Sequence, residues 1–94
     1  MPGIRALVIH PTDDVAVVFA DAAPGEAVEA SCGAATQTLV ARQAIPAGHK
    51  IALRDLLPGS PVHKYGEKIG LALQPISPGD HVHLHNLASD RVKA

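Results

Sequence analysis

A Pro-Gly corner recurs four times along this chain of 94 residues and limits the folds available to it. In three corners Gly directly follows Pro, in one an Ala stands between them, and each is followed within three residues by a β-branched residue. The corners are Pro24-Gly25, Pro46-Ala47-Gly48, Pro58-Gly59 and Pro78-Gly79. A type II turn needs positive φ at its second central position, which Gly adopts at the lowest cost. Each corner therefore predicts a sharp turn that feeds a short strand.

The segments between the corners are short, apolar and β-branched, and they predict strands. We expect these strands over residues 4–10, 15–20, 26–30, 36–40 and 50–53. The first two are joined by turn residues and predict a hairpin, and the next two predict a second pair. The unbroken apolar run 15–20 predicts burial on both faces. Helical periodicity is nearly absent, apart from at most one turn at 54–57, so we expect a compact all-β domain over residues 1–87 and a tail over 88–94.

The composition excludes several classes of function. The chain is 47% hydrophobic but only 2% aromatic, and its net charge is −1 without any run of Lys or Arg. Nucleic-acid binding needs a basic stripe or stacking rings, so we expect none. No apolar run approaches the roughly 20 residues that span a bilayer, so we expect no membrane insertion. A single cysteine, Cys32, excludes an internal disulfide and indicates a cytoplasmic protein.

Residues 79–86 read Gly-Asp-His-Val-His-Leu-His-Asn and predict a strand with His81, His83 and His85 on one face. The β-carbons of His83 and His85 would then lie about 6.6–7 Å apart. Imidazoles at that spacing can bind one ion through bonds of about 2.0–2.1 Å. We therefore predict His83 and His85 as metal ligands and place His81 outside the first coordination shell. The alternative is an ordinary half-exposed strand with a solvated histidine face.

A third ligand would come from His10, Asp13, Asp14 or His49, and His10 completes the predicted metal set. His10 ends the first expected strand, where a His beside two carboxylates is a plausible site. Alternatively, the two aspartates only close the hairpin turn, and that is the interpretation we favour.

The candidate catalytic residues are His10, His49 and Lys50. Lys50 could also neutralise an anionic substrate, although most lone lysines are solvated. Tyr65 could donate a proton or simply anchor a small core. The predicted substrate-binding residues are His49, Lys50, Lys64, Tyr65 and Asn86.

Three ordered segments, residues 48–53, 62–70 and 76–86, resemble the SAF domain of altronate and galactarate dehydratases. His10 and residues 13–17 resemble the opening segment of that family, although Asp14 stands where the family usually has Asn. The match is weakest over residues 26–40. The resemblance implies a β-clip fold, an elimination of water or sulfite from a 2-hydroxy acid, and dependence on Fe²⁺ or Mn²⁺.

The resemblance also implies that this domain works with a much larger polypeptide. Because the chain ends soon after Asn86, we expect a stand-alone small subunit, as in the two-subunit lyases that include sulfolactate sulfo-lyase. It would bind a small hydroxy acid or a metal through its histidines, would be inactive alone, and would need a large catalytic subunit that supplies the base. Two alternatives remain open: a non-catalytic binding module for a small acidic sugar, like the antifreeze-like SAF domain, and a structural domain whose short β edges form a homo-oligomer.

Overall fold

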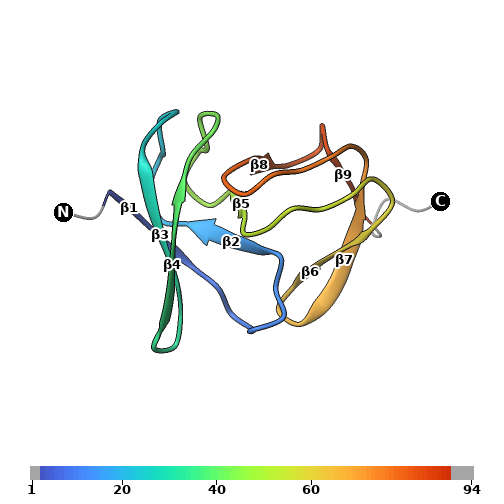
Figure 1. Cartoon of the computed structure of the whole chain (residues 1–94), viewed down its shortest axis with the longest axis horizontal. Coiled ribbons are helices and arrows are strands. Elements are labelled where there is room, and N and C mark those ends of the chain that lie inside the picture. Colours follow the sequence, from blue (N-terminus) through green and yellow to red (C-terminus); the bar gives the residue numbers. More distant parts are fainter. Residues whose placement is uncertain (1–2, 90–94) are drawn as a thin grey trace.

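The computed structural model describes residues 3–89, and within that range the chain forms nine short strands and no helix (Figure 1). The strands are β1 (Ile4–Leu7), β2 (Val15–Val18), β3 (Ala27–Cys32), β4 (Ala35–Val40), β5 (Lys50–Ala52), β6 (Pro61–Lys64), β7 (Glu67–Ala72), β8 (His81–Val82) and β9 (Leu87–Ser89). The predicted all-β class is confirmed. Since the described residues contain no helix, none is long and apolar enough to cross a membrane.

The strands form a six-stranded sheet in the order β4-β3-β1-β2-β5-β8 and a three-stranded sheet in the order β6-β7-β9. The two predicted hairpins are confirmed, because β1 pairs antiparallel with β2 and β3 pairs antiparallel with β4. The parallel pairing of β1 with β3 was not predicted. In Figure 1 the β3-β4 hairpin and the three-stranded sheet lie at opposite ends, with β2 and β5 between them.

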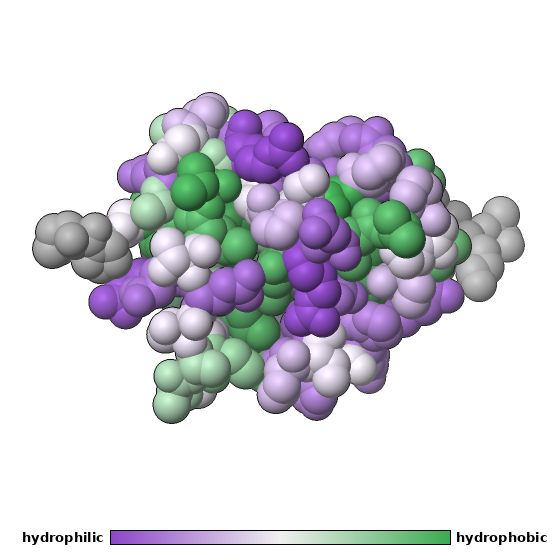
Figure 2. Space-filling view, viewed as in Figure 1, coloured by the Kyte–Doolittle hydropathy of each residue, from purple (hydrophilic) through white to green (hydrophobic). Residues whose placement is uncertain are grey.

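Two cores of aliphatic side chains hold the sheets together, and β2 and β5 contribute to both. Val15 and Ala52 pack in the core next to the three-stranded sheet, whereas Val18 and Ile51 pack in the other. The burial on both faces predicted for residues 15–20 is therefore confirmed over Val15–Val18 and is wrong for Phe19 and Ala20, which are exposed. Few aromatic side chains were available for these cores, and both rings stay outside: Phe19 is 62% and Tyr65 is 56% exposed. On the face drawn in Figure 2, a hydrophilic band separates two apolar areas.

All four Pro-Gly corners form the predicted turns. The φ angles of Gly25, Gly48, Gly59 and Gly79 lie between 83° and 92°. In each turn the residue after Gly donates its N–H to the carbonyl three residues earlier, at 3.0 Å. The residue three positions before each Gly is apolar and buried, and these residues form two isolated bridges, Ala22–Ile45 and Leu56–Ile76. Each corner thus turns the chain and also places one side chain in a core.

The strand expected over residues 79–86 is wrong beyond Val82. The chain turns after β8, and Leu84, which a continuous strand would place on the face opposite the histidines, is 73% exposed. Asn86 causes this turn, because its Oδ1 accepts the N–H of His83 at 2.9 Å and its own N–H donates to the carbonyl of His83 at 3.1 Å. β9 then pairs with β7 across the expected domain boundary at residue 87, and residues 90–94 of the expected tail lie outside the described range.

Candidate functional site

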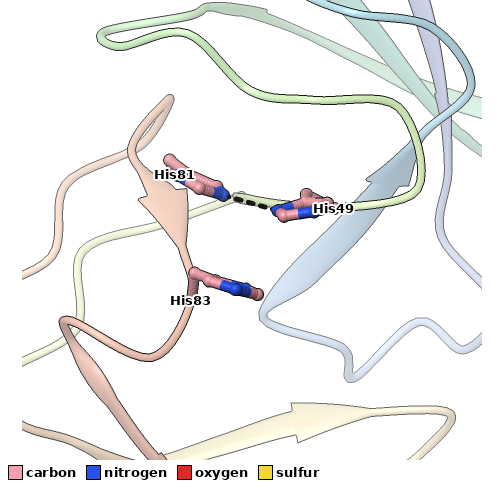
Figure 3. Close-up of side chains that lie close together, drawn as sticks. All are labelled: His49, His81 and His83. Atoms are coloured by element: carbon pink, nitrogen blue, oxygen red, sulfur yellow. Dashed lines mark hydrogen bonds between the residues drawn. The ribbon is translucent and has the colours of Figure 1, made fainter.

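Three histidines meet beside the β5-β8 pair. His49 directly precedes β5, His81 begins β8 and His83 follows it. The Nδ1 atom of His49 lies 3.0 Å from Nε2 of His81, and the rings of His49 and His83 stack with centroids 4.5 Å apart. Figure 3 shows His49 and His81 facing each other across this hydrogen bond, with His83 beside them. One ring nitrogen from each residue lies within 4.8 Å of the others.

The main chain of this histidine cluster is held by two amide side chains. Gln43 accepts the N–H of His81 at 2.8 Å, and Nδ2 of Asn86 donates to the carbonyl of His81 at 2.9 Å. Asn86 is only 2% exposed, and both polar atoms of its side chain bond to the main chain. Asn86, which was predicted to bind substrate, therefore lies where it positions the main chain of the histidines.

The surroundings of His81 and His83 favour their neutral forms. Burial lowers the pKa of His81, and the neighbouring His49, His83 and His85 lower it further. Burial also lowers the pKa of His83, and the charges of His49 and Lys50 lower it further. A neutral imidazole has a free lone pair that can bind a metal ion or accept a proton.

The histidines that meet differ from the set expected from the sequence. His83 belongs to both sets, but His49 and His81 take the places of His85 and His10. His85 lies beside the cluster, with its ring centroid 5.6 Å from that of His81, but its nitrogens do not join those of His49, His81 and His83 in the group that could hold one ion. His10 lies elsewhere, with its Nδ1 2.8 Å from the hydroxyl of Thr12.

Asp13 does more than close the hairpin turn between β1 and β2. It is 1% exposed and accepts three main-chain N–H groups, from His10 at 3.1 Å, Tyr65 at 3.0 Å and Gly66 at 2.8 Å. Burial raises the pKa of Asp13, but these hydrogen bonds outweigh burial, and the pKa lies below its ordinary value. The carboxylate thus holds the β6-β7 turn, in which Tyr65 has a φ of 58°.

Asp14 makes a second connection between the two sheets. Its Oδ2 accepts the main-chain N–H of His63 at 2.8 Å and lies 2.9 Å from Nδ1 of the same residue. Its Oδ1 lies 3.5 Å from Nε of Arg54. The two aspartates therefore fix the position of β6 and of the turn that follows it.

A cleft of about 330 Å³ opens between this turn and the turn after β8. It is lined by Lys50, Lys64, Tyr65, Ile69, His83, Leu84, Leu87 and Ser89. Three of the predicted substrate-binding residues thus share one cleft with His83. The Lys64 ammonium lies 3.5 Å from the ring centroid of Tyr65. Burial lowers the pKa of Lys50, and the charge of Lys64 lowers it further. The four other lining residues were missed from the sequence, since only the packing of the two turns brings them together.

Comparisons with known proteins agree on one family. A family model described as the altronate/galactarate dehydratase SAF domain matches residues 4–90. The chain is 47% identical over 78 residues to an altronate dehydratase of Escherichia coli (strain K12), which covers 83% of this chain and 15% of that protein. It is 48% identical over 50 residues to a (2R)-sulfolactate sulfo-lyase subunit alpha of Chromohalobacter salexigens, which covers 53% of each chain. A subunit of the same name from Paracoccus pantotrophus is 45% identical over 53 residues, covering 56% of this chain and 79% of that subunit.

Proposed function

Because the chain belongs to the altronate/galactarate dehydratase SAF domain family, we propose that it is the SAF-type part of a sugar-acid dehydratase or of a related carbon–oxygen or carbon–sulfur lyase. The observation that carries this proposal is the meeting of His49, His81 and His83 beside a cleft that contains two lysines. The chain spans 15% of one relative and 53% of another. We therefore propose that it supplies one part of an active site and that a larger catalytic partner supplies the rest.

The chemistry of the cleft suits an elimination from a small hydroxy acid. Such a reaction removes a proton beside a carboxylate, stabilises the resulting enediolate and assists the leaving group. The lysines supply positive charge for carboxylate oxygens, and the neutral histidines supply nitrogen lone pairs. Of the candidate catalytic residues, His49 belongs to the histidine cluster and Lys50 to the cleft, whereas His10 lies outside both. The base that abstracts the proton is assigned to the catalytic partner, and the chain alone is expected to be inactive.

The histidine cluster also fits a divalent metal ion. With metal–nitrogen bonds of about 2.1 Å, two imidazole nitrogens on one ion lie about 3 Å apart. The facing nitrogens of His49 and His81 are 3.0 Å apart and share a hydrogen bond, so an ion that binds both replaces the proton between them. We propose that His49, His81 and His83 hold the ion. Of the two metals expected for the family, Fe²⁺ suits an imidazole ligand set better than Mn²⁺, which favours oxygen ligands. When bound, such an ion supplies Lewis-acid stabilisation of negative charge on substrate oxygens.

A chimera tests the proposed function. In the Escherichia coli altronate dehydratase, the segment that aligns with this chain is replaced by residues 4–90, and water elimination from altronate is measured. We expect activity above that of the enzyme lacking the segment, and loss of it when His49, His81 and His83 are all replaced by Ala. A chimera that has the parent's circular dichroism spectrum but only the activity of the deletion would contradict the proposal.

The cleft also supports a second candidate, a non-catalytic binding module for a small acidic sugar. In that case the chain would bind such acids, but the chimera would remain inactive. The other alternative, a structural domain that forms a homo-oligomer, predicts self-association in sedimentation and no effect of the histidine substitutions. A cytoplasmic location remains a prediction from the single cysteine.

A further inference from the structure

The cleft beside the histidine cluster is positively charged. Eight of the described residues 3–89 line it, and these include Lys50, Lys64 and His83 but no Asp or Glu. The salt bridges among residues 3–89 involve Arg42, Arg54 and His63, and neither of these two lysines takes part in one. Two ammonium groups that share a cleft repel each other, and an anion between them removes the repulsion.

The fold orders the main chain of Lys50 and the side chain of Lys64 before any ligand arrives. Lys50 pairs with Val82 in the β5-β8 ladder, so its main chain is fixed beside the histidines. Lys64 ends β6, and its ammonium lies over the ring of Tyr65. Tyr65 is in turn held by its hydrogen bond to Asp13. A site whose cations are already positioned loses less entropy when an anion binds.

The size and lining of the cleft limit the class of anion. A volume of about 330 Å³ is at the lower end of the range for small-molecule sites, about 300–1,000 Å³. Ile69 and Leu87 give it an apolar wall that a carbon chain can contact, and His83 connects it to the histidine cluster. These features suit a short organic acid better than an inorganic oxyanion.

We propose that Lys50 and Lys64 bind the carboxylate of a small 2-hydroxy acid in this cleft, with the hydroxyl-bearing carbons beside His83. The choice of a hydroxy acid rests on the proposed function. The binding site itself rests on the cleft, on its two lysines and on the absence of Asp and Glu among the described residues that line it.

The test is an NMR titration of the 94-residue chain, in the presence of a chelator, with four probes. Tartrate carries carboxylates and hydroxyls, succinate only carboxylates, threitol only hydroxyls, and inorganic phosphate is the oxyanion control. We expect tartrate to shift the amide signals of Lys50, Tyr65 and His83 in a saturable way, succinate to do so more weakly, and threitol and phosphate to leave them in place. Lys50→Met and Lys64→Met should each weaken tartrate binding about tenfold, because each removes one charged hydrogen bond.

Lys68→Met is the matched control, because it removes the same charge from the β6-β7 hairpin at a residue that does not line the cleft. Amide signals of β3 and β4 that stay in place show that each variant is folded. The proposal is overturned if tartrate causes no saturable shifts, if phosphate matches tartrate, or if both cleft variants bind as tightly as Lys68→Met.

The chimera experiment separates this inference from the proposed function. If tartrate binds through the two lysines but the chimera is inactive, the binding site is supported and the proposed lyase role is refuted. If the chimera is active, keeps its activity with both lysines substituted, and the chain does not bind tartrate, the binding site is refuted and the proposed lyase role is supported.

Discussion

Nδ1 of His49 lies 3.0 Å from Nε2 of His81, although the two residues are 32 positions apart in the sequence. A hydrogen bond between two imidazoles needs one N–H donor and one lone pair, so both rings cannot be fully protonated while it persists. The antiparallel pairing of β5 with β8, with Ile51 opposite His81, brings the two residues together. Several properties of the protein depend on this contact.

The first prediction concerns metal binding. His49→Ala, His81→Ala and His83→Ala should each weaken binding of Fe²⁺, or of Co²⁺ as a spectroscopic substitute, at least about tenfold, because each removes one nitrogen ligand. Isothermal titration calorimetry and the absorption of the Co²⁺ complex measure the effect. His85→Ala and His10→Ala are controls that should bind as the natural chain does. If only these two control variants lost metal binding, the ligand set expected from the sequence would be supported instead.

The second prediction concerns pH. The pKa values of His81 and His83 are lowered in the folded protein, so the unfolded chain takes up protons first as the pH falls. The stability is therefore greatest above the ordinary histidine pKa of 6.5 and decreases as the pH falls from there toward the lowered folded values. Urea unfolding of the metal-free chain at a series of pH values measures this. The variant with His81→Gln and His83→Gln should show a flatter profile; an unchanged profile would show that other groups cause the pH dependence.

The third prediction compares two corners. A Cβ on Gly79 would lie 2.1 Å from the carbonyl oxygen of Val40, whereas a Cβ on Gly59 would meet no atom within 4 Å. Both glycines have positive φ, so Gly59→Ala should cost about 1–2 kcal/mol from backbone strain alone. Gly79→Ala should lower the free energy of unfolding by more, because the main chain at Val40, the last residue of β4, must also move. Equal effects in urea unfolding would refute the steric difference.

The fourth prediction concerns the buried carboxylate of Asp13. Asp13→Asn replaces one of its two oxygens by an NH₂ group, which would face a main-chain N–H of Tyr65, His10 or Gly66 instead of accepting it. We expect a loss of about 3 kcal/mol in the free energy of unfolding, because buried charged hydrogen bonds are lost and donors are left without acceptors. Asp55→Asn is the control, since Asp55 is exposed. If both variants unfold at the same urea concentration, Asp13 does not hold the two sheets together.

The cleft could be only partly predicted. Lys50, Lys64 and Tyr65 were expected to bind substrate, and the structure brings them into one cleft. Their meeting depends on Asp13, which accepts the N–H of Tyr65 from 52 positions away. A turn residue and a buried acceptor look the same in a sequence, so Asp13 was interpreted as a turn residue, with a metal ligand as the alternative. Tyr65 was a possible core anchor until its exposure of 56% excluded that role.

The sequence by itself determined the features that depend on neighbouring residues. The four corners follow from the freedom of Gly to adopt positive φ, and the all-β class follows from short β-branched segments between them. The tertiary structure decided which histidines meet. His81, His83 and His85 alternate in the sequence, yet Asn86 turns the chain after Val82, and strand pairing brings His49 to His81 instead. The turn at Asn86 is local, and the alternating histidines concealed it in the sequence. The register of β5 against β8, by contrast, joins residues 32 positions apart, and local preferences cannot specify it.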